Sequence, residues 1–284
     1  MSRDNRWLLS HAANKHSQFG EDGVLAKVLE VVGEPTGWCV EFGAWDGRHL
    51  SNTFALIDEN DYSAVLIEGS AKKFHDLRAS FKDNDKVTPV HAFVGFGADD
   101  GLDQILAGTP IPREFDLLSI DIDGNDYHVW KAVQNYEPRV VIIEFNPTIP
   151  TAVEFVQPAD MSVNQGSSLR AITNLGKEKS YELVAVTDCN AIFVRARYYD
   201  KFEIADNSPE ALRPNESLVT WIFCGYDGQV FVRGHGIMPW HGVPYRESKM
   251  QRVARPFRQF PSNHGKLMRM LSRHYRSLKK RRWF

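Results

Sequence analysis

The chain has 284 residues, 43% of them hydrophobic and 25% charged, which is the composition of a globular protein with a substantial core. It contains no run of about 18 apolar residues and it starts with a polar segment, so we expect neither a membrane span nor a secretory signal, and a cytoplasmic location. The net charge of −2 conceals a basic end, because residues 248–284 hold 12 Lys or Arg and no Asp or Glu, leaving 22 basic and 36 acidic residues elsewhere.

The first third of the chain begins with a segment of weak pattern. Residues 1–15 are expected to form an N-terminal arm. Gln18 and Asp22 then precede an apolar helical pattern over 24–32, so Asp22 is suited either to capping this helix or to contacting a ligand. Three dispersed cysteines lack metal-ligand spacing and are expected to be reduced core residues: Cys39, Cys189 and Cys224.

Apolar runs alternate with helical patterns as far as residue 197. This alternation predicts an α/β fold with a doubly wound, mostly parallel seven-stranded sheet and right-handed crossovers. Further helices are expected over 50–60, 71–82, 101–107, 127–135 and 167–180. The strands are expected over 39–42, 64–67, 87–94, 117–122 and 139–145, followed by an antiparallel hairpin over 181–186 and 191–194.

A glycine-rich turn follows the first expected strand. Gly43 and Gly47 allow a sharp turn and a close approach of the backbone to a ligand. A helix starting near Leu50 would direct its free N–H groups to the same place. The spacing does not fit the dinucleotide pattern GxGxxG. Taken alone, the turn is equally consistent with an ordinary strand-to-helix connection.

Acidic and amide side chains recur at the ends of four expected strands. Because ligands of parallel α/β sheets bind at the carboxyl ends of the strands, these side chains indicate one polar site. The residues are Glu41 with Asp46, Glu68, Asp121 with Asp123, and Glu144 with Asn146.

The chain resembles the class I S-adenosylmethionine-dependent methyltransferases, and among them the FkbM-type family. Four segments carry the resemblance, with a terminal hairpin after them, and it extends over residues 16–197. It implies a Rossmann-like methyltransferase domain that binds S-adenosylmethionine. Members of the family more often have Asp where Glu41 stands and Asn where Asp46 stands. The four segments are VEFGAWDG, VLIEGS, FDLLSIDIDGNDYHVW and PRVVIIEFNP.

The resemblance also implies roles for the residues of the cofactor site. Gly43 would lie against the methionine part of the cofactor, Glu41 or Asp46 would bind its amino group, and Glu68 would bind the ribose hydroxyls. The loop after Val94 would contact the adenine. Four further residues are expected to bind the cofactor: Gln18, Gly69, Ser70 and Asp121.

The acids after the fourth and fifth strands suggest how a hydroxyl acceptor would be activated. Asp123, Glu144 and Asn146 offer the hard oxygen ligands that suit Mg²⁺. We expect Asp123, Asp126 and His128 to be catalytic, with His128 as a general base. The alternatives are that the acids cap the following helix and that His128 is packed or solvated.

Residues 198–261 are expected to form an appended lobe or lid. Residues 262–284 are expected to form a basic amphipathic tail that lies on an anionic membrane, binds a nucleic acid or an acidic partner, or is simply solvated. Nucleic acid is disfavoured as a substrate because the body is acidic. The resemblance implies an O-methyltransferase acting on a sugar or glycan. The alternatives are a non-catalytic scaffold of the same fold and a nucleotide-sugar oxidoreductase, the latter disfavoured by the absent GxGxxG.

Overall fold

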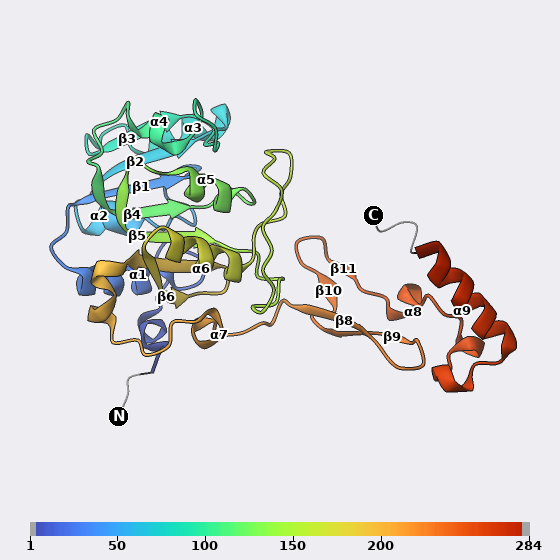
Figure 1. Ribbon diagram of the computed structural model, residues 1–284. Helices are drawn as coiled ribbons and strands as arrows, with labels where there is room; N and C mark the ends of the chain where they lie inside the picture. The colour runs from blue at the N-terminus through green and yellow to red at the C-terminus, as the bar shows by residue number, and fades with distance from the viewer. Residues whose placement is uncertain (1–3, 280–284) are drawn as a thin grey trace. The chain divides into compact units, whose positions relative to one another are not determined.

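The computed structural model describes residues 4–279, and it divides into one unit over Met1–Glu216 and another over Ser217–Phe284. The first unit holds the sheet and its helices (Figure 1). Its helices are η1 Trp7–His11, α1 Glu21–Val32, α2 Phe54–Glu59, α3 Ala71–Ser80, α4 Leu102–Leu106, α5 Asp126–Ala132, α6 Leu169–Glu178, η2 Ala196–Phe202 and α7 Pro209–Leu212. Its strands are β1 Trp38–Phe42, β2 Ser63–Glu68, β3 Val87–His91, β4 Glu114–Ile120, β5 Glu137–Glu144, β6 Tyr181–Val186 and β7 Asn190–Arg195.

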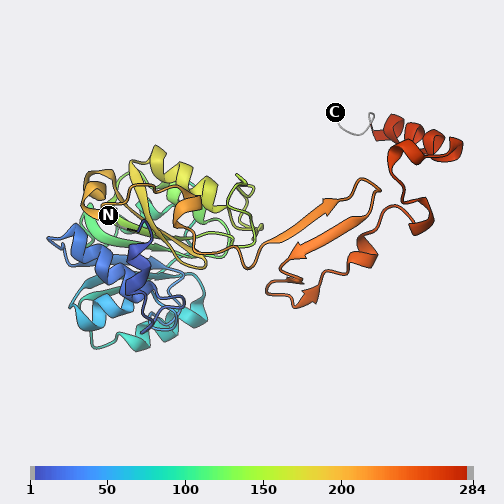
Figure 2. The ribbon, with the colours of Figure 1, turned by 90° about the horizontal axis from the view of Figure 1, so that it is seen from below.

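The seven strands form one sheet in the order β3-β2-β1-β4-β5-β7-β6. The first five strands run parallel, whereas β7 pairs antiparallel with both β5 and β6. Helices cover both faces of the sheet, so its central strands are buried on each side (Figure 2). The predicted fold class is confirmed. The chain order reverses between β1 and β4, and the carboxyl ends of these two strands mark the expected ligand position.

The N-terminal arm is part of the core. Trp7 and Leu8 are buried, and the indole N–H of Trp7 donates a 3.0 Å hydrogen bond to the carbonyl of Phe202 in η2. Phe202 and Leu212 are themselves fully buried, so the first unit extends to residue 216 instead of ending at 197. The sequence did not reveal this docking because the few apolar residues of the arm form no repeating pattern.

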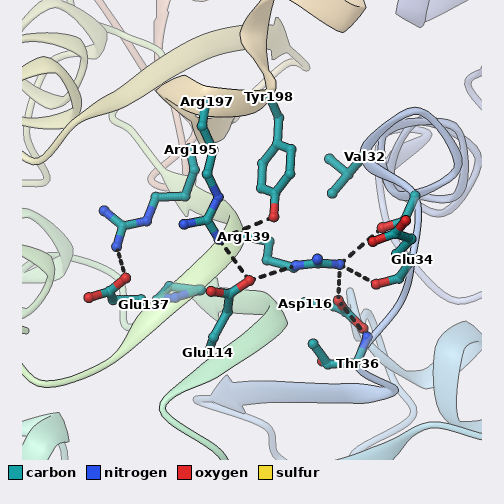
Figure 3. A network of polar contacts seen from close by, with 12 residues as sticks. Val32, Glu34, Thr36, Glu114, Asp116, Glu137, Arg139, Arg195, Arg197 and Tyr198 are labelled. Atoms are coloured by element: carbon teal, nitrogen blue, oxygen red, sulfur yellow. Dashed lines mark hydrogen bonds and ion pairs between the residues drawn. The ribbon is translucent and has the colours of Figure 1, made fainter.

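An ionic network ties together the amino ends of β4 and β5 (Figure 3). The guanidinium of Arg139 donates to the carboxylates of Glu114 (3.1 Å) and Asp116 (3.4 Å) and to the carbonyls of Gly33 and Glu34. Asp116 is fully buried and also accepts from the N–H groups that follow Glu34 at residues 36 and 37. These contacts stabilise the edge of the sheet that lies opposite the carboxyl ends of the strands.

The second unit contains short elements and little core. Among its described residues, only two hydrophobic side chains are buried, Val219 and Val230. All three cysteines were predicted to lie in the core, but only Cys39 is buried. Cys189 is half-buried and Cys224 is exposed. The unit consists of β8 Thr220–Cys224 paired with β9 Val230–Gly234, β10 Ile237–Met238 paired with β11 Val243–Pro244, α8 Glu247–Met250, η3 Arg255–Phe257, η4 Pro261–Asn263 and α9 Lys266–Lys279.

Within residues 4–279, every helix is too short or too polar to cross a bilayer. The helix predicted in the basic tail is present as α9, and the side chain of Leu278, which the sequence placed on its apolar face, lies outside the described side chains.

Candidate active site

The turn after β1 brings the backbone of this strand against the end of β4. Gly43 has a φ of +74°, and a Cβ on it would lie 2.1 Å from the carbonyl oxygen of Asp121. Any side chain at this position would therefore clash, which explains the glycine. Gly43 is exposed, so its backbone is open to a ligand. Trp45 also has a positive φ, of 47°, which is uncommon for a residue with a Cβ.

Glu68 joins the turn after β1 to the end of β2. Its Oε2 accepts from the N–H of Trp45 (3.0 Å), and its Oε1 accepts from the N–H of Ser70 (2.6 Å). Each oxygen thus keeps a lone pair with which a carboxylate can accept from a ligand hydroxyl. Gly69 lies under the ring of Phe93, which would come within 2.4 Å of a Cβ there. The predicted residues Glu68, Gly69 and Ser70 are therefore brought together at one edge.

Glu41 has a structural surrounding that the sequence did not reveal. Its buried carboxylate accepts from the hydroxyls of Ser51 (2.6 Å) and Thr53 (2.7 Å) and from the N–H of Asn52 (2.9 Å). Burial raises the pKa of Glu41, and these hydrogen bonds oppose that shift. With its oxygens occupied by this turn, Glu41 holds residues 51–53 in place rather than facing the cofactor amino group that was expected of it.

The same contacts correct the expected start of the second helix. The helix begins at Phe54 instead of near Leu50, and the N–H groups at residues 53 and 54 donate to the hydroxyl of Ser51. Its first donors are consumed inside the protein. The helix N-terminus therefore has few free N–H groups to offer a ligand.

Asp46 and Gln18 are the least defined of the predicted cofactor residues. Asp46 folds back on its own turn, where its Oδ1 accepts from the N–H groups of Arg48 (2.9 Å) and His49 (2.8 Å). Burial would raise the pKa of Asp46, but these N–H groups lower it overall. Gln18 is exposed, and its carbonyl accepts from the side chain of Asn14.

Asp22 shapes the loop that carries Gln18. Its Oδ2 accepts from three successive backbone N–H groups, of residues 15, 16 and 17, each at 2.8 Å, and from the hydroxyl of Ser17. Next to it, the Glu21 carboxylate accepts from Thr187 (2.7 Å) and Asn190 (3.1 Å). Asn190 pairs with Glu144 across the β5–β7 ladder, so this loop lies near the carboxyl end of β5.

Three acids meet where β4 and β5 end. Oxygen atoms of Asp121, Asp123 and Glu144 all lie within 4.8 Å of one another, an arrangement that can hold a metal ion. Desolvation, and then repulsion from neighbouring carboxylates, raises the pKa of Asp121 to about 7 and that of Glu144 to about 9. A cation would relieve this repulsion.

The structure changes the predicted metal set. Asp121, predicted as a cofactor residue, lies among these acids. Asn146 was predicted as a ligand, but its Oδ1 already accepts from the N–H (2.9 Å) and hydroxyl (2.7 Å) of Thr148, and its Nδ2 donates to the carbonyl of Gln165. The amide of Asn146 thus organises the loop after β5.

Asp126, predicted to be catalytic, is buried and holds the loop that precedes it through hydrogen bonds. Its two oxygens accept from the N–H groups of Ile122 and Gly124, each at 2.9 Å, and burial raises its pKa to about 6. Asp126 therefore fixes the loop that carries Asp123, whose φ is +57°. Asp123 itself is exposed at the surface of this loop and can meet a substrate.

His128 attaches the long loop after β5 to α5. Its Nε2 lies 2.8 Å from the carbonyl of Gln157, so Nε2–H is the donor and Nδ1 is the remaining basic atom. Asn125 donates to two further carbonyls of this loop, those of Asp160 and Val163. Gln157 is buried and accepts from the loop's own backbone. His128 thus holds this loop in place, a role that the sequence did not predict for it.

Two contributors to the site were missed by the sequence analysis. The backbone N–H of Trp45 holds Glu68, and such a main-chain contact leaves no residue-type signal. Phe93 is 75% exposed beside Gly69, just before the loop after Val94 that was expected to meet the adenine. A lone phenylalanine after a strand could have indicated a stacking surface, because apolar side chains left in water often mark a binding site.

No family model matches the chain, and no match is found among curated proteins. Several solved structures are similar in fold. The N-terminal domain of EvdMO1 in the presence of SAH (S-adenosylhomocysteine) and D-fucose has 12% identity and a TM-score of 0.43, over 62% of this chain and 82% of that chain. An O-methyltransferase from Bacillus cereus in complex with SAH has 17% identity and a TM-score of 0.40, over 66% and 84%.

A third similar structure is TrmK of M. capricolum in complex with SAH, with 11% identity and a TM-score of 0.36 over 60% of this chain and 65% of that chain. At these identities the likeness concerns the fold alone, and nothing in it singles out the FkbM-type family. A fold of this kind does not by itself identify the reaction or the substrate.

Proposed function

We propose that the chain is an S-adenosylmethionine-dependent O-methyltransferase that acts on a sugar hydroxyl of a glycan or glycoconjugate. The observation that carries the proposal is the hydrogen bond between Trp45 and Glu68, because it holds a carboxylate against the turn that also contains the open backbone of Gly43. This combination suits a nucleoside with two vicinal hydroxyls and an attached amino-acid part. The sugar acceptor is supported by the FkbM-type resemblance of the sequence motifs.

The residues of this edge fit the cofactor. Glu68 has lone pairs left to accept from ribose hydroxyls, and Gly43 presents no side chain toward the ligand. The carboxylates of Asp121 and Asp123 give the rim a negative charge that favours a positively charged sulfonium. When bound, S-adenosylmethionine supplies an electrophilic methyl group at that sulfur.

Transfer to a hydroxyl requires both alignment and removal of a proton. Because the methyl group would come from the cofactor's sulfonium, the loop residues would have to hold the acceptor oxygen in line with that methyl group. We assign the hydroxyl proton to Asp123, because it is exposed whereas Asp126 is buried and occupied. Asp121, Asp123 and Glu144 would hold Mg²⁺ through one oxygen each, which would lower the pKa of the hydroxyl and leave the second oxygen of Asp123 to accept its proton.

Calorimetric titration of the full chain with S-adenosylhomocysteine, with and without Mg²⁺, tests the proposal. We expect micromolar binding that Glu68→Ala weakens and that Glu30→Ala, on the exposed surface of α1, leaves unchanged. Transfer of a labelled methyl group to a panel of glycan acceptors should follow. Binding of NAD(H) instead would favour the oxidoreductase alternative, and cofactor binding without transfer to any acceptor would favour the scaffold.

A further inference from the structure

The second unit, residues 217–284, leaves an unusual number of apolar side chains in water. Large hydrophobic residues are exposed on its hairpins, its turns and α9. Only Val219 and Val230 are buried among its described hydrophobic side chains. The exposed ones are Trp221, Ile222, Phe223, Tyr226, Ile237, Met238, Trp240, Val243, Phe257, Phe260, Leu267, Met270 and Leu271.

Strand β8 of the β8–β9 hairpin exposes apolar side chains on both of its faces. Successive residues of a strand point to opposite faces, and Trp221, Ile222 and Phe223 are 46%, 53% and 50% exposed. A two-stranded hairpin is marginally stable in water without a covered face. A surface that covers these side chains would stabilise the hairpin.

The charge of the unit identifies the kind of partner. Residues 217–284 contain 14 Lys or Arg but only two acids, Asp227 and Glu247, whereas residues 1–216 hold 20 basic and 34 acidic residues. The basic residues continue through α9, where Arg269 and Arg273 alternate with the apolar stripe. A strongly basic and apolar surface is complementary to a partner that is both anionic and apolar.

We propose that residues 217–284 bind the surface of an anionic phospholipid bilayer. The exposed Leu267, Met270 and Leu271 lie at helical spacing on α9, which suits a helix lying in the plane of the membrane interface. Trp221 and Trp240 have the amphipathic rings that favour the headgroup region. The Lys and Arg side chains of the unit pair with lipid phosphates.

The distribution of the apolar side chains favours a bilayer over a macromolecular partner. A folded protein requires one complementary patch, whereas these side chains occur on every part of the unit. A single-stranded nucleic acid would use the aromatic rings for stacking but would leave the aliphatic Leu267, Met270 and Leu271 uncovered. A fluid interface covers both kinds.

Co-sedimentation of the full chain with vesicles tests the proposal. We expect binding to vesicles of phosphatidylglycerol and phosphatidylcholine in equal parts, and binding at least roughly tenfold weaker to pure phosphatidylcholine. Replacement of Leu267, Met270 and Leu271 by Ser should weaken binding to the anionic vesicles by a similar factor. The matched control removes two exposed apolar side chains of the first unit, Val153→Ser with Met161→Ser, and should bind as wild type.

A second variant keeps the test valid if the triple Ser variant fails to fold. Arg255→Glu with Arg273→Glu changes only exposed charges and should shift binding to lower ionic strength. Three results would overturn the proposal: no binding to anionic vesicles at low salt, tight binding of poly(U) that the triple Ser variant retains, or a wild-type dimer that the triple Ser variant converts to monomer. The last would assign the surface to a second copy of the chain.

Discussion

Glu68, at the carboxyl end of β2, accepts a hydrogen bond from the backbone N–H of Trp45 in the turn after β1, with 3.0 Å between Oε2 and N. The carboxylate thereby ties the turn after β1 to the end of β2, 23 positions further along the chain. If it also binds the ribose, one side chain both builds the site and contacts the ligand.

Substitution of Glu68 should therefore be costly even when it is conservative. Glu68→Gln turns an NH₂ group toward the N–H of Trp45 or Ser70, and two donors cannot pair. We expect the affinity for S-adenosylhomocysteine to fall at least about tenfold, equivalent to about 1.4 kcal/mol, by calorimetry. If Glu68→Gln and wild type bind S-adenosylhomocysteine with equal affinity, Glu68 does not belong to the cofactor site.

Asp123 and Asp126 should separate function from stability. Asp126→Asn places an amide where two backbone N–H groups need an acceptor, and should lower the free energy of unfolding by roughly 1–3 kcal/mol. Asp123→Asn occupies a left-handed backbone position that asparagine tolerates, so its stability should be unchanged while methyl transfer falls roughly 100-fold. Urea unfolding and a transfer assay on both variants measure the contrast. The reverse pattern would exchange the two roles.

The acidic cluster predicts how stability varies with pH. Asp121 and Glu144 have pKa values of about 7 and about 9 in the fold, above the ordinary 3.8 and 4.5, so the folded protein retains protons that the unfolded chain releases. Their contribution to stability is fully present below about pH 4 and is lost as the pH rises through 7 and then 9. Asp121→Asn should therefore match the wild-type melting temperature near pH 4 and exceed it increasingly toward pH 9.

The stabilisation of the fold by Mg²⁺ should increase with pH, whereas the stability contributed by the two carboxyl groups alone decreases with pH. Because Mg²⁺ binds ionised carboxylates, the rise in melting temperature that it causes should grow with pH and disappear in Asp121→Asn. Asp99→Asn, an exposed aspartate in the loop after β3, is the matched control and should behave as wild type. A magnesium effect that is equal at pH 5 and pH 8 would exclude this cluster as the binding site.

Arg139 should be critical for stability and irrelevant to cofactor binding. Arg139→Met leaves the buried Asp116 without its cation and should lower the free energy of unfolding by roughly 3–5 kcal/mol. The control Arg113→Met removes only an exposed ion pair with Glu137 and should cost less than about 1 kcal/mol. The folded fraction of Arg139→Met should bind S-adenosylhomocysteine with unchanged affinity. Weaker binding would show that the two edges of the sheet are coupled.

The sheet was predictable because each of its strands has an apolar run of its own, as Val140 to Ile143 in β5 illustrates. The strand-end acids could be placed at one edge by topology alone. Their individual roles could not be predicted, because these depend on which backbone N–H groups face each carboxylate. Glu41, near the end of β1, and Asp126, in the segment after β4, are acids like the exposed Asp123, yet turns in the chain enclose them.

The contact between Trp7 and Phe202 also constrains when the first unit can finish folding during synthesis. The two residues are 195 positions apart, and a ribosome adding 5–20 residues per second needs roughly 10–40 s to reach residue 202. Until then the hydrogen bond between Trp7 and Phe202 cannot form, and Phe202, which is fully buried in the finished fold, is absent from the core. The first unit can therefore complete its core only after Phe202 has been synthesised. Before that, the nascent chain leaves part of this interior accessible to chaperones and to other chains.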